Sequence, residues 1–183
     1  MRISIGGGQG TGKTTLAQKL SEHFKLQLIP DIADIMIRNY LMSIKNNTKE
    51  NTFLLFQKKA IEEKIEMEKK FDSFISDTSV VDYFAVTMIF AKNMASKNFL
   101  HLKERVQKAA MRYNTIIVIP SGKFTLQENG KRSSDYMHQW RRYVILVGWL
   151  TLWNIPWFPV YGNRAEERFR EVLDWMEKNR WVS

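Results

Sequence analysis

A glycine-rich run between an apolar segment and an amphipathic segment constrains this chain more than any other feature. Residues 7–14, GGQGTGKT, match the pattern G-x-x-x-x-G-K-[ST], in which glycines let backbone N–H groups turn inward toward a phosphate. Residues 2–5 alternate in polarity, which predicts a strand, and residues 13–24 carry apolar side chains at helical spacing. A strand before the loop and a helix after it predict a phosphate-binding loop.

The loop predicts a site for a nucleoside triphosphate and Mg²⁺. The partial positive charge of a helix N-terminus favours anions, Lys13 can reach the β- and γ-phosphates, and the Thr14 hydroxyl can bind Mg²⁺. The pattern does not separate a kinase from an ATPase, a GTPase or a motor. The residues expected at the nucleotide all lie in the loop or directly after it: Gly8, Gly10, Thr11, Gly12, Lys13, Thr14 and Thr15.

Strands and helices alternate along the rest of the chain. Short apolar runs predict further strands, and they lie at 26–29, 73–76, 115–120 and 157–160. Helical spacing between and after them predicts helices over 31–43, 48–70, 80–93, 100–112, a stretch ending near 153, and 164–178. This alternation predicts an α/β fold with a parallel sheet covered on both faces, whose ligands lie at the carboxyl ends of the strands.

Two aspartates follow predicted strands and are candidate site residues. Asp77 could hold Mg²⁺ through water or accept a proton from an attacking hydroxyl; alternatively, Asp77 or Ser79 caps the next helix. Asp31 could bind the hydroxyl of an acceptor or act as a base; alternatively, it caps the helix that follows. Asp34 and Asp82 are expected to be solvated or to cap helices.

A basic segment follows the strand at 115–120. Lys131 and Arg132 lie in a glycine-containing loop, and Arg141 and Arg142 follow on the next helix. Mobile cations that close over a transferring phosphoryl group stabilise its charge and exclude water, so residues 121–142 are expected to form a lid with Arg132 as its first cation. The alternative is a solvated basic loop.

Asn163 and Arg164 follow the last predicted strand. The backbone there could frame an adenine, and Arg164 could stack on it. The alternative is a helix cap in which Asn163 is the N-cap and Glu166 is the third residue of the helix.

Composition narrows the class of partner. The net charge of +9 favours a polyanionic partner, and the absence of cysteine excludes disulfides and thiolate metal sites, which is compatible with a cytoplasmic protein. The 183 residues suit one α/β domain, and no signal peptide is recognisable. The uncharged stretch 143–163 contains Pro156 and Pro159, which favours a buried helix, a turn and a strand over a membrane span.

In order and spacing, these segments resemble the P-loop nucleoside and nucleotide kinases, in the AAA-type ATPase-like group related to ribosylnicotinamide kinase. The matching segments are GGGQGTGKTTLAQKL, LIPDIAD, LLFQKKAIEEKI, FISDTSVVDYFAV, NGKRSSD and PVYGNRAEERFREV. The resemblance implies five parallel strands in the order 2-3-1-4-5, in one P-loop kinase domain spanning 1–183.

The resemblance also implies roles for individual residues. It places ATP on Lys13 and Thr14, and Mg²⁺ near Thr14 and Asp77. The remaining residues that it assigns are Asp31 and Gln57 on the acceptor side, Lys131 and Arg132 in the lid, and Asn163 and Arg164 near the adenine.

Two departures from the family pattern concern the acceptor. Asp31 replaces the usual glutamate and Asp34 the arginine three residues later, while Thr78 replaces the arginine of an Asp-Arg-Ser triplet. Both changes remove a cation that would hold the phosphate of a free nucleotide. Small phage kinases of this family act on modified nucleotides, including bases within DNA, which the basic charge would suit.

The sequence therefore predicts a Mg²⁺- and ATP-dependent kinase that phosphorylates a hydroxyl of a nucleoside, a nucleotide or a modified nucleotide unit in DNA. The alternative is an NTP-dependent, nucleic-acid-binding ATPase or switch without a small acceptor. The sequence does not determine whether Asp31 or Asp77 is the base, or the oligomeric state.

Overall fold

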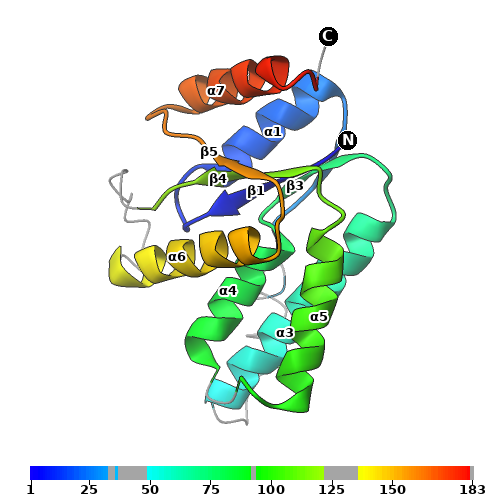
Figure 1. The fold of residues 1–183 in the computed structure, drawn as a ribbon, viewed down its shortest axis with the longest axis vertical. Coiled ribbons are helices and arrows are strands. Elements are labelled where there is room, and N and C mark those ends of the chain that lie inside the picture. The colour runs from blue at the N-terminus through cyan, green and yellow to red at the C-terminus, as the bar shows by residue number, and fades with distance from the viewer. Residues whose placement is uncertain (33–35, 37–48, 92–93, 122–135, 182–183) are drawn as a thin grey trace.

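A parallel five-stranded sheet forms the centre of the protein. A computed structural model of the chain describes residues 1–32, 36, 49–91, 94–121 and 136–181 (Figure 1). The strands are β1 (Arg2–Gly7), β2 (Gln27–Ile29), β3 (Phe74–Asp77), β4 (Thr115–Ile119) and β5 (Trp157–Pro159). Their order is β2-β3-β1-β4-β5 and every neighbouring pair is parallel, which confirms the predicted topology.

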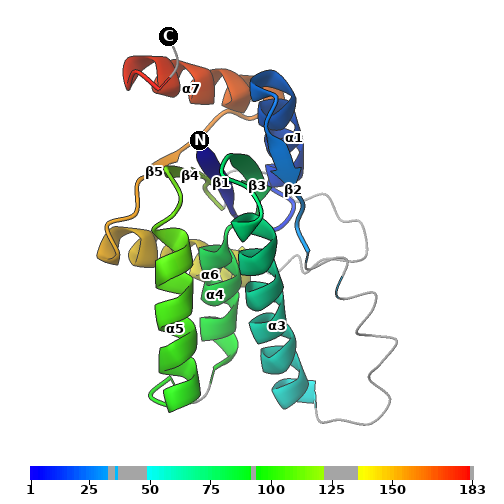
Figure 2. The same cartoon turned by 90° about the vertical axis from the view of Figure 1, so that its right-hand side faces the viewer.

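Helices cover both faces of the sheet. The described helices are α1 (Lys13–Phe24), α3 (Lys49–Lys69), α4 (Val80–Phe90), α5 (Lys97–Ala110), α6 (Tyr136–Leu152) and α7 (Ala165–Lys178). Helices α1 and α7 lie on one face, whereas α6 runs along the other face and α3, α4 and α5 extend away from it side by side (Figures 1 and 2). Two covered faces explain why β4 is a nearly continuous apolar run instead of an alternating sequence.

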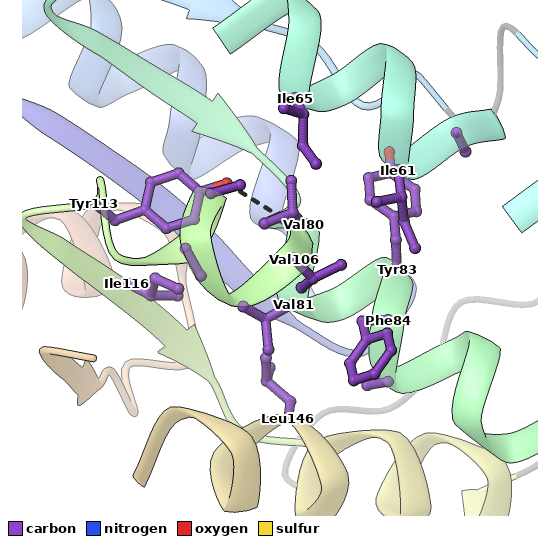
Figure 3. Close-up of a cluster of buried hydrophobic side chains, with 14 of the residues drawn as sticks. Ile61, Ile65, Val80, Val81, Tyr83, Phe84, Val106, Tyr113, Ile116 and Leu146 are labelled. Atoms are coloured by element: carbon purple, nitrogen blue, oxygen red, sulfur yellow. Dashed lines mark hydrogen bonds between the residues drawn. The ribbon is translucent and has the colours of Figure 1, made fainter. Parts of the chain in front are cut away.

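Each face of the sheet has its own apolar cluster, because successive side chains of a strand point to opposite faces. In β4, Ile117 and Ile119 pack toward α1 and α7, while Ile116 and Val118 pack toward the other helices. Figure 3 shows the second cluster, where Val81 and Phe84 of α4 lie among side chains from α3, α5 and α6. The backbone N–H of Val80 donates to the Tyr113 hydroxyl at 3.3 Å, so the start of α4 is fixed to the loop before β4.

The structure differs from the sequence-based expectation in detail. The predicted helix over 31–43 lies almost wholly outside the described residues. Helix α7 begins one residue later than expected, with Arg164 as its N-cap in place of Asn163 and Glu167 as its third residue in place of Glu166. Helix α6 is expected to be buried, but part of its surface faces solvent: the exposed fraction is 51% for Trp140 and 71% for Leu152. No described helix combines the length and apolar character needed to span a bilayer.

Candidate active site at the carboxyl edge of the sheet

The phosphate loop joins β1 to α1 at the carboxyl edge of the sheet. Thr11 Oγ1 and Lys13 Nζ both donate to the Gly8 carbonyl, at 2.9 and 2.7 Å, so the loop curls around its own backbone. Gly12, with φ of 87°, is the N-cap of α1, and no side chain caps this helix or places an acid in its first turn. The N-terminus of α1 is thus left to a ligand of negative charge.

Two side chains beyond β4 approach the loop closely. A Cβ added at Gly8 would lie 2.4 Å from Gln139 Oε1 of α6 and 2.7 Å from Ser121 Oγ. Ser121 Oγ is buried and has no hydrogen-bond partner among the described residues. Glycine at this position therefore lets polar groups from the end of β4 and from α6 reach the phosphate loop.

Lys13 is the cation of the loop, and it lies in a charged cluster. Burial is the main cause that lowers the pKa of Lys13, and the nearby Arg142 guanidinium lowers it further. The carboxylates of Asp82, Asp31 and Asp77 oppose this shift and raise the pKa. The structure therefore brings both predicted strand-end aspartates into electrostatic range of the loop lysine.

Asp77 lies opposite the loop, because β3 pairs with β1 in a register that places it beside Ile5. Burial raises the pKa of the Asp77 carboxyl, while a hydrogen bond with the Thr14 side chain and the charge of Lys13 lower it. Asp77 is 2% exposed, and its Oδ1 has no hydrogen-bond partner in the described part of the chain. The two predicted metal ligands, Thr14 and Asp77, are therefore in contact, and a ligand could bind the remaining oxygen.

Asp31 lies at the end of β2 and is held by two hydroxyls. Tyr83 OH donates to its Oδ1 at 2.5 Å, and Thr78 Oγ1 donates to its Oδ2 at 2.9 Å. Thr78 adopts a φ of 68°, which is unfavourable for a β-branched residue and directs its hydroxyl away from the neighbouring Asp77 toward Asp31. This contact joins the ends of β2 and β3 at the predicted acceptor side.

Asp82 is fully buried, which corrects the expectation of a solvated or simply capping residue. Its Oδ1 accepts from the backbone N–H of Gly7 at 3.0 Å and from Arg142 at 3.2 Å. Its Oδ2 accepts from Ser79 Oγ, and Ser79, rather than Asp77, is the N-cap of α4. Asp82 therefore connects the base of the phosphate loop to α4 and α6, and Arg142 is the member of the 141–142 pair that points inward.

Lys64 of α3 is a fully buried lysine that the sequence analysis missed. Its Nζ donates to the carbonyls of Pro30 and Asp77 at 2.8 Å each and to that of Ile29 at 3.4 Å. Burial lowers the pKa of Lys64, and the charge of Glu68 is the largest of the influences that raise it. One ammonium group thus ties the ends of β2 and β3 together directly behind both aspartates.

Glu68, one helical turn after Lys64, is 2% exposed. It accepts from Ser76 Oγ at 2.5 Å and from the Tyr113 hydroxyl at 2.9 Å. Burial raises the pKa of Glu68, whereas the charge of Lys64 lowers it. The two residues form a polar connection between α3 and the carboxyl half of β3.

Gln57 lies two turns before Lys64 on the same face of α3, since seven residues are close to two helical turns. Its side chain is 6% exposed and its Oε1 has no hydrogen-bond partner within the described ranges. Buried amide oxygens in proteins usually have a hydrogen-bond partner, and a bound ligand could supply one for Gln57.

Lys131 and Arg132, the predicted lid cations, lie outside the described residues.

Asn163 and Arg164 are exposed in the connection between β5 and α7. The backbone N–H groups of both donate to Glu167 Oε2, at 2.8 and 3.3 Å, which fixes the entry into α7. Arg168, one turn into the helix, donates to the carbonyls of Gly162, Asn163 and Thr11. The predicted adenine side and the phosphate loop are therefore directly connected.

The missed residues share a signal that the sequence does contain. Lys64, Asp82 and Arg168 are charges that lie among the buried apolar side chains of their helices; Val172 and Met176, for example, follow Arg168 on the buried stripe of α7. A charge on such a stripe must find a partner when the helix packs. The sequence could have marked these positions, although not the strand ends and loops that they contact.

Residues 2–168 match the sequence model of the AAA domain family. The chain belongs to the AAA domain family. No curated protein sequence matches it. The phosphate loop, β3 and the first turn of α7 all lie within the matched residues, so the family covers every site residue described above.

Solved structures with the same fold include several kinases. Deoxyadenosine kinase from M. mycoides with bound dATP is 13% identical, with a TM-score of 0.64, and the match covers 97% of this AAA domain chain and 99% of that chain. The NadR protein in complex with NR is 14% identical, with a TM-score of 0.72, covering 99% of this chain and 52% of that chain. Shikimate kinase from Aquifex aeolicus vf5 is 16% identical, with a TM-score of 0.56 and 98% of each chain covered.

At these identities the likeness establishes the fold and not the substrate. The AAA domain has the sheet order and helical covering of these P-loop kinases over almost its whole length. Its chemistry therefore has to be argued from its own side chains.

Proposed function

We propose that this chain is an ATP-dependent phosphotransferase that uses Mg²⁺ and phosphorylates a hydroxyl of a nucleoside or another small acceptor. One observation carries this proposal: Asp31 and Asp77 both lie within electrostatic range of Lys13 at the carboxyl edge of the sheet, and Asp77 also contacts Thr14. A phosphate loop alone is found in every kind of P-loop NTPase. A second carboxylate, that of Asp31 in addition to that of Asp77, could bind the hydroxyl of an acceptor.

The donor side follows from the loop. The N–H groups at the start of α1 and the ammonium of Lys13 would neutralise the phosphates of ATP. In the structure Lys13 donates to the Gly8 carbonyl and could exchange this neutral partner for a charged phosphate oxygen. Burial of Lys13 among these groups strengthens its attraction to an anion, because water screens the charge poorly there.

The donor set fits a magnesium ion. Thr14 and Asp77 offer a hydroxyl and a carboxylate oxygen in contact with each other, and Mg²⁺ prefers oxygen ligands. Among the described residues no group of three or more histidine, aspartate or glutamate side chains could hold a metal ion. A site of one carboxylate and one hydroxyl suits an ion that takes most of its ligands from phosphates and water, and the ion would supply positive charge at the phosphates.

The acceptor side follows from Asp31. Tyr83 and Thr78 donate hydroxyl hydrogen bonds to both of its oxygens, so the orientation of the carboxylate is set. A carboxylate oxygen has more than one lone pair and can also accept from an acceptor hydroxyl. We assign Asp31 the role of orienting and deprotonating the acceptor, because Asp77 is engaged with Thr14.

The remaining predicted residues complete the proposal. Gln57, with its buried and unpartnered Oε1, would bind a polar group of the acceptor, and Asn163 and Arg164 would lie beside the base of ATP. Lys131 and Arg132 remain proposed lid cations within residues 121–142, in a single kinase domain over 1–183. The names of the structurally similar deoxyadenosine and shikimate kinases favour a small acceptor over a nucleotide unit in DNA.

The test is transfer of label from γ-labelled ATP to a panel of nucleosides, nucleotides, small hydroxy acids, single-stranded DNA and duplex DNA. We expect labelling of one class of small acceptor, dependence on Mg²⁺, and loss of labelling in Asp31→Asn with ATP binding retained. Release of inorganic phosphate at the same rate with and without acceptors, unchanged in Asp31→Asn, would overturn the proposal in favour of an ATPase. Label in DNA alone would replace the small acceptor with a polymeric one.

A further inference from the structure

Arg168 of α7 joins two loops that the chain places far apart. Its Nε donates to the Gly162 carbonyl at 2.7 Å, and one Nη donates to the Asn163 carbonyl at 3.1 Å. The other Nη donates to the carbonyl of Thr11 in the phosphate loop, 157 residues away in sequence. The guanidinium donates from three different nitrogens in a rigid planar fork, whereas the donors of a lysine share one nitrogen, so a lysine could not reach the same three carbonyls.

The surroundings of the guanidinium leave it little freedom. Arg168 is 5% exposed, although it carries a permanent charge. A Cβ added at Gly12 would lie 2.7 Å from its Nη1, so the guanidinium packs directly against the phosphate loop. Movement of either loop would break buried hydrogen bonds of this charged group and leave carbonyls unpaired, which costs free energy.

The loop between β5 and α7, at residues 161–164, makes close contacts with the first two turns of α7. A Cβ added at Gly162 would lie 2.6 Å from Glu167 Cβ and 2.8 Å from Arg168 N. Glu167 and Glu171 accept from the backbone N–H groups of Asn163 and Tyr161, at 2.8 and 2.6 Å. These contacts hold the loop against α7, and Arg168 connects it to the phosphate loop.

We propose that Arg168 is a positioning residue that sets the distance between the phosphates and the base of the bound nucleoside triphosphate. The inference rests on the proposed function, in which the phosphate loop binds the phosphates and the loop at 161–164 lies beside the base. The phosphate loop keeps its own internal bonds to the Gly8 carbonyl without Arg168. Loss of Arg168 therefore affects a ligand that spans both loops more than a ligand that occupies the phosphate loop alone.

The test compares binding of Mg²⁺–ATP with binding of Mg²⁺–tripolyphosphate, which lacks the nucleoside. In Arg168→Lys we expect the Kd of ATP to rise about tenfold and the Kd of tripolyphosphate to change less than about twofold. Arg170→Lys is the matched control, because Arg170 is exposed on the same helix, and both ligands should bind it as they bind the unaltered chain.

A second variant displaces the loop that is proposed to lie beside the base, without substituting Arg168. Gly162→Ala introduces a Cβ where there is no room for one, so it displaces the loop at 161–164 and should also weaken ATP binding selectively. Thermal unfolding of each variant shows whether the fold is retained. Selective weakening in Gly162→Ala would support the proposal even if Arg168→Lys did not fold.

Equal weakening of ATP and tripolyphosphate in both variants would overturn the proposal, since Arg168 would then only support the phosphate loop. Unchanged binding of both ligands would overturn it as well. Failure of the proposed function gives a different result. The unaltered chain would bind ATP, and Arg168→Lys would weaken that binding selectively, but the unaltered chain would transfer no label to any acceptor.

Discussion

The proposed donor and acceptor ends of the site are built in opposite ways. The donor end is a run of adjacent residues, Gly7 to Thr14, whose bonds to the Gly8 carbonyl are local. The acceptor end gathers side chains from the ends of β2 and β3 and from α3 and α4, joined by Lys64, Thr78 and Tyr83. The difference shows that a phosphate site needs mainly a backbone shape, whereas an acceptor site needs side chains placed by the whole fold.

Lys13→Met tests the donor end and should have the largest effect. Removing the ammonium leaves the transferring phosphoryl charge without its buried cation, so turnover with every acceptor should fall about a thousandfold. The measurement is the rate of label transfer from ATP. Lys19→Met, on the same helix and paired with Glu166 at the surface, is the control and should keep full activity. Substantial transfer by Lys13→Met would show that the loop lysine has no catalytic role.

Asp31→Asn tests the acceptor end separately. The amide keeps the shape of the carboxylate but cannot take a proton, so kcat should fall about a hundredfold while the Kd of ATP is unchanged. Steady-state kinetics together with ATP binding separate the two quantities. The control is Asp72→Asn, because Asp72 is exposed and remote from the hydroxyls that hold Asp31. An equal loss of ATP binding would mean that the two ends are not independent.

Lys64→Met tests whether the acceptor end is one unit. The substitution removes the donor to the carbonyls at the ends of β2 and β3 and leaves them buried and unpaired, so the free energy of unfolding should fall by about 2 to 3 kcal/mol. The measurement is urea denaturation. Lys59→Met, exposed on the same helix, should change it by less than about 0.5 kcal/mol. In the folded protein we expect the KM of the acceptor to rise and that of ATP to stay the same.

Asp77→Asn tests the residue that both ends share, and its effect on stability should be the smallest. Burial raises the folded-state pKa of Asp77 above its ordinary value of 3.8, so the folded chain holds this proton to higher pH than the unfolded chain. Stability therefore falls as pH rises from 3.8 through the raised pKa, and stays lower above it. The asparagine variant should lack this fall and be slightly more stable than the unaltered chain at neutral pH without ligand.

Thermal unfolding across pH, with and without Mg²⁺–ATP, checks this prediction. An identical pH dependence in the variant and the unaltered chain would contradict it. The same variant should lose most of its phosphotransfer activity, because the carboxylate proposed to hold Mg²⁺ with Thr14 is gone. Greater stability together with lower activity is the usual sign of a charge retained for function.

Local patterns predicted much of the fold. The bounds of α1 and the apolar run of β4 follow from helical spacing and from β-branched residues, and both agree with the structure. The order of the five strands came from the family resemblance and is also confirmed. The sequence predicts Asn163 as the cap of α7, one residue too early, because the backbone N–H groups of Asn163 and Arg164 both donate to Glu167, which makes Arg164 the N-cap.

Part of the candidate site was also predictable, because some of its residues follow from local sequence patterns. Lys13 and Thr14 are part of the motif, Asp77 ends β3 and Asp31 follows β2, so topology alone brings them to one edge. From the sequence Asp82 is expected to be solvated or to cap a helix, and two of the partners that bury it, Gly7 and Arg142, are 75 and 60 residues away in the chain.

The sequence by itself determined the phosphate-loop motif and the alternation of strands and helices, because these depend on residues that are neighbours in the chain. Only the tertiary structure decided that Lys64 joins the ends of two strands, that Thr78 faces Asp31, and that Arg168 connects the loop after β5 to Thr11. A buried charge must satisfy its hydrogen bonds wherever the fold offers acceptors, and the backbone carbonyls that do so here are not distinguished by any residue type.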